Sequence, residues 1–338
     1  MIFHNRPTIG RDETLAISRV INSKQVSQGN EVKQFQKEFA RYLKLPEKNV
    51  VAVNNGTSAL YLALWALNAK KKNIIYPAYS CSSLRYATSL VGGLEDLRDI
   101  NKDSPNMEIG DYKKNSIVIN PHMYGFPSII KKKKTINFID DSCQSLGSKL
   151  KNKPLLTGKV SIFSFYATKM MTTAGQGGML ASKDSSLISE VKDYLDFDCR
   201  NDSKIRFNFQ MTDVQAAMGR IQLKKLEDFI LKRDEIFKFY KNLNLPLLDI
   251  KYKSKIKPVR YRVILLNKNP KIIINKFKKL GIEVINPLET SELLSKNKRF
   301  KNSIEFTKNT ISLPCYPSLR KNDLIKIEQA IDKLRSYI

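Results

Sequence analysis

The sequence predicts an α/β fold with a mostly parallel mixed sheet between helices, followed by a smaller α+β unit. Three observations point to it. Short apolar runs alternate with helical runs through the first part of the chain, which is typical of parallel sheets covered by helices on both faces. This pattern changes after about residue 240. The length of 338 residues, with 42% apolar residues, suffices for a large domain and an appended smaller one.

The elements of the first part follow in order from their residue types. Asn49–Val53 predicts a buried strand, residues 54–56 a turn and Thr57–Asn68 a helix. Trp65 lies in this apolar helix and is expected in the core. The predicted strands are Asn49–Val53, Asn73–Tyr76, Ser116–Asn120, Ile136–Asp140, Ser161–Phe165 and Gly178–Ser182. Ligands of such sheets bind beyond the carboxyl ends of the strands.

The second part begins after an amphipathic helix predicted over Leu223–Leu243. It contains an apolar run at Tyr261–Leu266, a helix near Lys271–Leu280, a further apolar segment at Gly281–Ile285 and a final amphipathic helix from about Lys321 to Tyr337. We therefore predict a large domain at residues 1–240, which includes an N-terminal helical segment, and a small C-terminal α+β domain at residues 241–338.

The chain is strongly basic. It has 59 Lys and Arg against 32 Asp and Glu, a formal charge of +27, which favours anionic partners without choosing among them. The run Lys131–Lys134 is interpreted as a solvated loop surface. Because the basic residues are scattered, a non-catalytic regulator or nucleic-acid-binding protein is the weaker alternative, and we predict no nucleic-acid partner.

Cysteine usage indicates the compartment, and histidine usage bears on metal binding. The four cysteines are far apart and form no CxxC pair, which favours a reduced intracellular chain; they are Cys81, Cys143, Cys199 and Cys315. With only two histidines, His4 and His122, no metal site is predicted. His122 fits two interpretations, a structural histidine or one that lines a site. No signal sequence or membrane span is recognisable, so we expect a cytoplasmic protein without a membrane partner.

Polar residues follow three of the predicted strands. Gly56, Thr57 and Ser58 open a helix, whose free N–H groups and dipole favour an anion such as a phosphate. Asp141 follows the strand at 136–140, and Lys169 follows the strand at 161–165. A carboxylate, a lysine and an anion cradle at neighbouring strand ends suggest imine chemistry. Together they match the pyridine nitrogen, the aldehyde and the phosphate of pyridoxal 5'-phosphate (PLP).

Motifs in order along nearly the whole chain carry a family resemblance. They include NNGTSALYLAL at 54–64, PAYS at 77–80, PHMYGFP at 121–127, IDDSCQSLG at 139–147, FSFYATK at 163–169, GQGGML at 175–180, FNFQMTDVQAAMGRIQLKKL at 207–226 and LPCYPSL at 313–319. With them the sequence resembles the DegT/StrS-type nucleotide-sugar aminotransferases, which are PLP-dependent enzymes of the aspartate aminotransferase fold (fold type I). The segment SQGNEVKQFQKEFARYL at 27–43 is similar to the N-terminal helix of that family.

The resemblance implies a role for each matching residue. Lys169 is expected to form the internal aldimine with PLP and then to move the proton, and Asp141 to pair with the pyridine N–H. The resemblance also implies cofactor contacts for Gly56, Thr57, Ser58, Tyr79, Cys81, Cys143, Gln144 and Ser164. Asn208 matches an asparagine that reaches the cofactor phosphate of the neighbouring subunit, so a homodimer with shared active sites is expected.

The implied reaction is the transfer of an amino group from an amino acid, glutamate in most of the family, to a nucleotide-linked keto-sugar. The product would enter a surface polysaccharide or a related glycan. A PLP-dependent sugar dehydratase-like relative is an alternative, but in this family that chemistry tends to come with His in place of the lysine, and Lys169 is present.

Four positions depart from the family pattern, among them Cys143, which stands where the family usually carries a small alanine. Cys81 stands where many members carry an aromatic residue that stacks on the cofactor ring, and Tyr79 is a candidate substitute. Gln176 replaces a usual acid, and Gln210 a usual Arg or Lys. These differences leave the predicted cofactor site intact and bear on the identity of the sugar and the donor.

Overall fold

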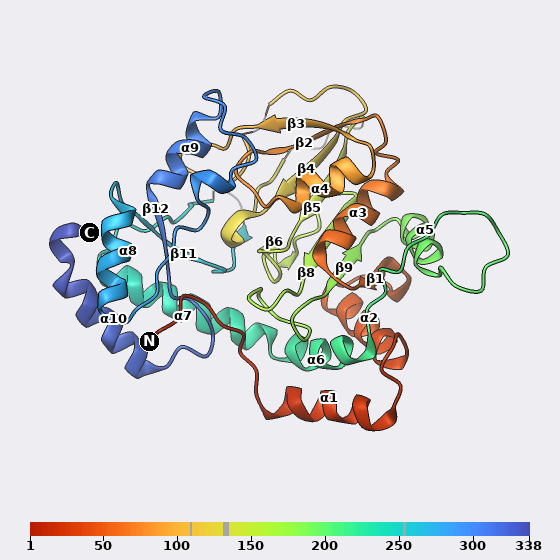
Figure 1. Cartoon of the computed structure of the whole chain (residues 1–338), viewed down its shortest axis with the longest axis horizontal. Coiled ribbons are helices and arrows are strands. Elements are labelled where there is room, and N and C mark those ends of the chain that lie inside the picture. Colours follow the sequence, from red (N-terminus) through yellow and green to blue (C-terminus); the bar gives the residue numbers. More distant parts are fainter. Residues whose placement is uncertain (109, 131–134, 253–254) are drawn as a thin grey trace.

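The fold is built on a seven-stranded mixed sheet, seen in a computed structural model (Figure 1) that describes residues 1–338 except 109, 131–134 and 253–254. The run Lys131–Lys134 lies outside the described residues. In spatial order the strands are β1 (Val50–Val53), β9 (Gly178–Ala181), β8 (Val160–Ser164), β5 (Asn137–Asp141), β4 (Ile117–Pro121), β2 (Asn73–Pro77) and β3 (Leu94–Arg98). All neighbours pair in parallel except β9, which is antiparallel to both β1 and β8. The predicted α/β fold with a mostly parallel mixed sheet is confirmed.

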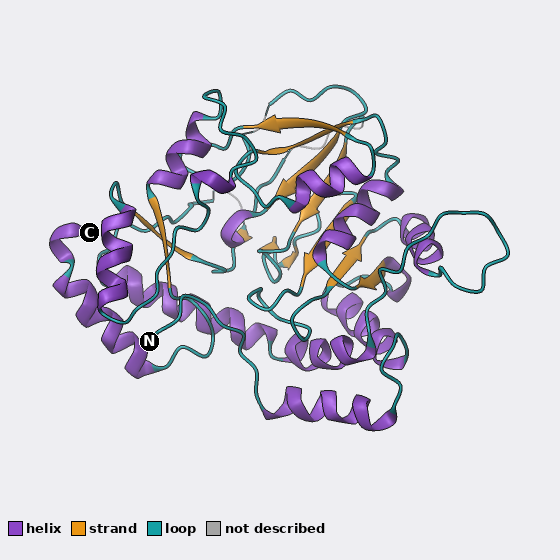
Figure 2. Ribbon diagram, in the orientation of Figure 1, coloured by secondary structure: helices purple, strands orange, loops and turns teal. Residues whose placement is uncertain are grey.

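Helices cover both faces of this sheet, as Figure 2 shows. Strand β1 illustrates why: Val51 and Val53 belong to one apolar cluster and Val50 and Ala52 to another, because successive side chains of a strand point to opposite faces. The first cluster includes side chains of α3 (Gly56–Ala66), α4 (Ser83–Leu90) and α5 (Ser185–Leu195); the second includes side chains of α2 (Asn30–Tyr42) and α6 (Asp213–Lys224).

The N-terminal helices are attached to α6. The Asp213 carboxylate accepts hydrogen bonds from the backbone N–H groups of Gly29, Glu31 and Val32 at 2.8–3.1 Å. These N–H groups at the start of α2 have no partner within the helix, and Asp213 supplies one. Helix α1 (Arg11–Ser23) packs on α6 through a small apolar cluster. The predicted helix at 223–243 is interrupted, because α6 ends at Lys224 and α7 (Leu226–Asn242) begins after Lys225.

The last part of the chain forms a smaller unit with its own apolar cluster. Its antiparallel pair consists of β11 (Val263–Leu266) and β12 (Thr310–Leu313), and its helices are α8 (Pro270–Lys279), α9 (Lys301–Lys308) and α10 (Lys321–Lys333). The C-terminal half of α7 packs into this cluster. The predicted domain boundary after residue 240 falls within the last turn of α7, and it stays a prediction. The segment at 281–285 forms only isolated bridges, of Ile282 with Ile2 and of Ile285 with Ser312.

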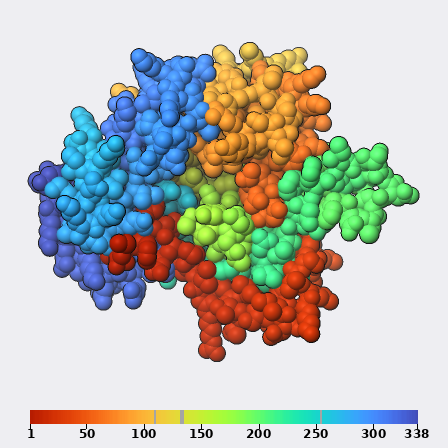
Figure 3. Space-filling model, viewed as in Figure 1, coloured from red at the N-terminus to blue at the C-terminus, as the bar shows by residue number. Residues whose placement is uncertain are grey.

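Short elements complete the chain. The small strands β6 (Lys149–Leu150), β7 (Lys153–Pro154) and β10 (Ile256–Lys257) form a separate sheet, and the 3₁₀ turns are η1 (Glu47–Asn49), η2 (Met123–Gly125), η3 (Thr290–Glu292) and η4 (Arg335–Tyr337). The segment between α5 and α6, residues 196–212, projects from the body of the molecule (Figure 3). Trp65 is not in the core as predicted: it is 36% exposed and lies against the Tyr194 ring. Within the described residues, no helix is both long enough and apolar enough to cross a membrane.

Candidate active site

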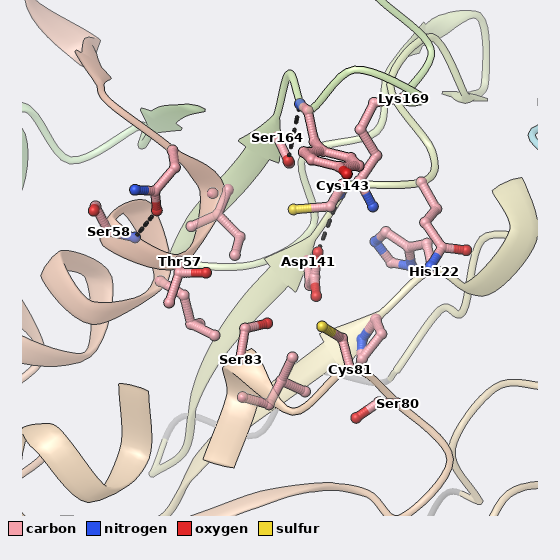
Figure 4. Close-up of a pocket in the computed structure, with 18 of the residues that line it drawn as sticks. Thr57, Ser58, Ser80, Cys81, Ser83, His122, Asp141, Cys143, Ser164 and Lys169 are labelled. Atoms are coloured by element: carbon pink, nitrogen blue, oxygen red, sulfur yellow. Dashed lines mark hydrogen bonds between the residues drawn. The ribbon is translucent and has the colours of Figure 1, made fainter. Parts of the chain in front are cut away.

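A cavity of about 740 Å³ lies beyond the carboxyl ends of the central strands, where the sequence predicts the ligand site. Residues from β4, β5, β8, the loop after β8 and the start of α3 line it, among them Lys169 and Asp141 (Figure 4). Its volume lies in the range of sites for small molecules and cofactors. The two residues on which the predicted chemistry depends therefore share one cavity.

The N-terminus of α3 forms the anion-binding end of the cavity. The Asn55 side chain caps the helix by accepting the Ser58 N–H at 2.8 Å, while the N–H groups of Gly56 and Thr57, in the first turn, have no partner within the helix. A Cβ atom at Gly56 would lie 2.7 Å from the Cβ of Ser164, so only glycine lets α3 approach β8 this closely. Thr57, Ser58 and Ser164 all line the cavity, and their hydroxyls suit an anion there.

The two aspartates at the end of β5 have different environments. Asp141 is half-buried, faces the cavity and accepts the Cys143 N–H at 3.1 Å. Asp140 is 1% exposed and binds the N–H groups of Thr157 and Gly158 at 2.6 and 2.7 Å. Burial raises the pKa of Asp140, but the nearby His122 ring and the hydrogen bonds from Gly158 and Thr157 outweigh it and lower the pKa overall. Asp141 is thus the carboxylate available to a ligand, and Asp140 is structural.

Lys169 lies in the loop after β8, with its amine in the cavity and 5.5 Å from the centre of the Tyr261 ring. Burial lowers the pKa of Lys169, but the neighbouring Tyr261, Cys143 and Asp141 outweigh it and raise the pKa overall. For Tyr261, burial raises the pKa, but the cations Lys169, Arg262 and Arg233 outweigh it and lower the pKa overall. The ammonium and the phenol thus favour each other's charged forms.

The other predicted cofactor contacts divide into two groups. Cys81, Cys143 and Gln144 line the cavity, and Gln144 also accepts the backbone N–H of Tyr124 at 2.8 Å. Tyr79 does not line it. Its side chain is fully buried, hydrogen-bonded to the Tyr124 hydroxyl and packed edge-on against Phe306, so the suggestion that Tyr79 replaces the missing aromatic is wrong.

Asn208 is also not among the residues that line the cavity of its own chain. It is exposed on the projecting segment, where its Oδ1 accepts the Gln210 N–H at 3.1 Å. This position is compatible with the predicted contact to a neighbouring subunit, which stays a prediction. Of the departures from the family pattern, Gln176 lines the cavity, whereas the Gln210 amide donates to the Leu195 carbonyl at 3.0 Å.

The cavity also contains residues that the sequence did not single out. Ser80 and Ser83 line it close to the start of α4, and Tyr166, 46% exposed, lines it near Lys169. The consecutive serines Ser82 and Ser83, at the start of a helix, are the sequence signal that could have indicated polar side chains on this side of the cavity. His122 satisfies both interpretations: it lines the cavity, and its Nδ1 accepts the Ser128 N–H at 3.1 Å while Nε2 lies 3.6 Å from Asp140.

These residues fit PLP. The glycine-dependent approach of α3 to β8 leaves a cradle with serine and threonine hydroxyls for the phosphate. On the same cavity Asp141 offers a carboxylate to the ring nitrogen, and Lys169 offers an amine to the aldehyde. Cys81 and Cys143 present small thiol side chains to the space between them.

Comparison with known proteins decides the family. The model of the DegT/DnrJ/EryC1/StrS aminotransferase family matches residues 7–332. The chain belongs to this family. The predicted family, fold type and enzyme class are thereby confirmed, and PLP is the cofactor of this aminotransferase.

Individual members of the DegT/DnrJ/EryC1/StrS family resemble the chain over nearly its full length. It is 28% identical to a UDP-4-amino-4,6-dideoxy-N-acetyl-beta-L-altrosamine transaminase of Campylobacter jejuni, over 96% of this chain and 94% of the relative. It is 27% identical to a GDP-perosamine synthase of Escherichia coli, over 98% of both chains. Helicobacter pylori PseC, an aminotransferase involved in the biosynthesis of pseudoaminic acid, has the same fold, with a TM-score of 0.86, 23% identity and 99% coverage of both chains.

Proposed function

We propose that this protein transfers an amino group from an amino acid, glutamate in the first instance, to a nucleotide-linked keto-sugar for the synthesis of a surface polysaccharide or related glycan. The observation that carries the proposal is the placement of Lys169 and Asp141 on one cavity with the N-terminus of α3. The names of two relatives, a GDP-perosamine synthase and a transaminase of a UDP-linked amino-sugar, support the substrate class.

Each residue has a defined task in this reaction. PLP supplies the electron sink that allows a proton to leave the carbon bearing the amine. Asp141 keeps the ring nitrogen protonated, which strengthens that sink. Lys169 would hold the aldehyde of PLP, and its amine would act as the base that takes and returns the proton. Thr57, Ser58 and the first turn of α3 hold the phosphate and fix the ring relative to Lys169.

We further propose a cytoplasmic homodimer in which the segment at 196–212 reaches the partner's site. The segment projects from the molecule and presents apolar side chains to solvent, with Ile205 78% and Phe207 54% exposed. Such side chains next to Asn208 favour burial against a second copy. All four cysteines are free, as in a reduced compartment.

The test is the absorbance of the purified PLP-loaded protein before and after glutamate. Wild type is expected to convert from the PLP form to the pyridoxamine form, and Lys169→Ala is expected not to. Lys70→Ala, which removes an exposed amine far from the cavity lining, is the matched control and is expected to behave as wild type. If no amino acid changes the wild-type spectrum, the proposed function is wrong even though PLP binds.

The acceptor is identified in the second half of the reaction. The pyridoxamine form is mixed with a panel of keto-sugars linked to UDP, GDP or dTDP, and recovery of the PLP spectrum shows which one is aminated. The alternative of a dehydratase-like enzyme predicts loss of a hydroxyl without net transfer of nitrogen, which mass spectrometry of the product distinguishes. The lysine at position 169 favours transamination.

A further inference from the structure

The positive charge of the chain is concentrated in its last part. Residues 241–338 contain 22 Lys and Arg against eight Asp and Glu, a formal charge of +14, which is about half of the total of +27 in less than a third of the chain. Within this part, residues 250–282 contain eleven Lys and Arg and no Asp or Glu. Helix α8 belongs to this stretch and lies at the surface of the small unit (Figure 1). A strongly basic helix is thus open to solvent.

Five lysines on and next to this helix form what we call the α8 basic face: Lys268, Lys271, Lys276, Lys278 and Lys279. Four of them are exposed, and Lys276 is half-buried with its amine 3.7 Å from the centre of the Tyr337 ring. Within the described residues none of the five forms an ion pair, whereas on α7 Lys238 pairs with Asp234 at 2.8 Å. The charge of the α8 basic face is therefore available to a partner.

The stability of α8 accounts for only part of this arrangement. Lysines in the last turn, here Lys276, Lys278 and Lys279, offset the negative end of the helix dipole. Lys268 and Lys271 lie at the other end, where a cation is unfavourable and the first turn contains no acidic residue. The charge at this end opposes the helix dipole, and an anionic partner outside the chain would offset it.

An exposed apolar side chain lies among these lysines. Lys271 and Lys279 are about two helical turns apart and so lie on one side of α8, and Ile272, 49% exposed, lies between them. On the opposite side Ile273 and Phe277 are buried in the core of the small unit, so α8 cannot insert into a bilayer as a free amphipathic helix does. It can lie against a surface, and lysines around an aliphatic side chain suit a bilayer with anionic headgroups.

We propose that the α8 basic face holds the enzyme against membranes that contain anionic lipids. Clusters of Lys and Arg bind such membranes because the negative potential of the headgroups attracts each cation. The expectation of no membrane partner followed from the lack of a recognisable membrane span, which a surface contact does not need. Nucleic acid is also an anion, but α8 carries no arginine, and its aromatic side chain, Phe277, is buried and not open to a base.

Cosedimentation of the PLP-loaded protein with lipid vesicles tests the proposal. Wild type is expected to bind vesicles of phosphatidylglycerol mixed with phosphatidylcholine but not of phosphatidylcholine alone, and to be released in about 1 M salt, where the screening length is about 3 Å. Lys271→Gln combined with Lys279→Gln is expected to weaken binding about 25-fold, about 5-fold for each lysine. The matched control combines Lys33→Gln with Lys37→Gln, which removes the same charge from exposed positions on α2 and is expected to bind as wild type.

The possible outcomes separate the α8 basic face from the total charge and from other anions. Equal binding of wild type and the α8 variant overturns the proposal, and so does an equal loss in the α2 variant. Absence of vesicle binding by wild type also overturns it, whether or not a DNA duplex binds through Lys271 and Lys279. Thermal unfolding verifies that each variant is folded. The glutamate half-reaction of the α8 variant is expected to match wild type, and the vesicle result stands even if no amino acid reacts.

Discussion

Cys81 offers a direct test of where the cofactor ring lies. Its thiol is exposed within the cavity, whereas Cys199 is exposed outside it. Burial and the nearby Asp141 raise the pKa of Cys143 well above its usual range, so its reactive thiolate is scarce. We expect iodoacetamide to label Cys81 and Cys199 before Cys143, and PLP to slow the labelling of Cys81 but not of Cys199, as measured by peptide mass spectrometry. Equal labelling of Cys81 with and without PLP would contradict this placement of the ring.

Asp141 is expected to contribute most of the electrostatic activation of the ring. Asp141→Asn keeps the shape but removes the negative charge that holds the ring nitrogen protonated. We expect the half-reaction with glutamate to slow by a factor on the order of 100 to 1000. Rapid-mixing absorbance measures the rate, and Asp103→Asn, at an exposed turn, is the control. A rate within a few-fold of wild type would mean that Asp141 does not serve the ring.

At the level of single residues, the sequence singled out Lys169, Asp141 and Gly56, and the structure brings these three to one cavity, while their roles stay predictions. Asp141 is the last residue of a strand and Gly56 and Lys169 follow strands, and strand ends are recognisable from apolar runs. Tyr79 was misplaced, because its side chain is drawn away from the cavity into a cluster with Tyr124 and Phe306.

The junction of α3 with β8 gives a prediction at the level of secondary-structure elements. Gly56→Ala places a Cβ atom 2.7 Å from that of Ser164, so α3 must move away from β8. We expect a loss of about 1 to 3 kcal/mol in the free energy of unfolding and weaker PLP binding. Urea unfolding and PLP titration measure the two effects. Gly110→Ala, with nothing within 4 Å of the added atom, is the control. Combining Gly56→Ala with Ser164→Gly relieves the contact and is expected to restore part of the stability.

Two segments differ from the sequence prediction, each for its own physical reason. Strand β3, with the sequence LEDLR, carries three charged residues and lies at the edge of the sheet, where only one neighbour covers it. The segment at 281–285 has an apolar pattern but pairs only through single bridges. By contrast, the central strands were predicted to within a few residues, because burial on both faces makes them continuously apolar.

At the level of the whole molecule, the lowered pKa of His4 predicts a loss of stability in mild acid. Its pKa falls from the usual 6.5 to about 3 in the folded chain, chiefly through burial. Between these values the unfolded chain binds the proton and the folded chain does not, so the free energy of unfolding decreases as the pH falls below about 6.5. The slope attributable to this residue is at most about 1.4 kcal/mol per pH unit.

Urea unfolding at pH 7, 6 and 5 measures this effect. His4→Gln keeps a polar side chain that does not titrate, and we expect a flatter pH profile for it than for wild type. Identical slopes would show that His4 is accessible to protons in the folded protein. The acidic limb at lower pH also involves Asp140, whose lowered pKa stabilises the fold until that carboxylate is protonated.

The two ends of the chain lie in the same unit (Figure 1). Ile2 pairs with Ile282, and the C-terminal carbonyls accept the Asn267 amide, while three residues after Ile2 the Asn5 amide donates to the carbonyl of Thr168 at 3.1 Å. The first residues thus form a tether from the small unit to the peptide that carries Lys169. Any displacement of one unit against the other would therefore act directly on the peptide that carries Lys169.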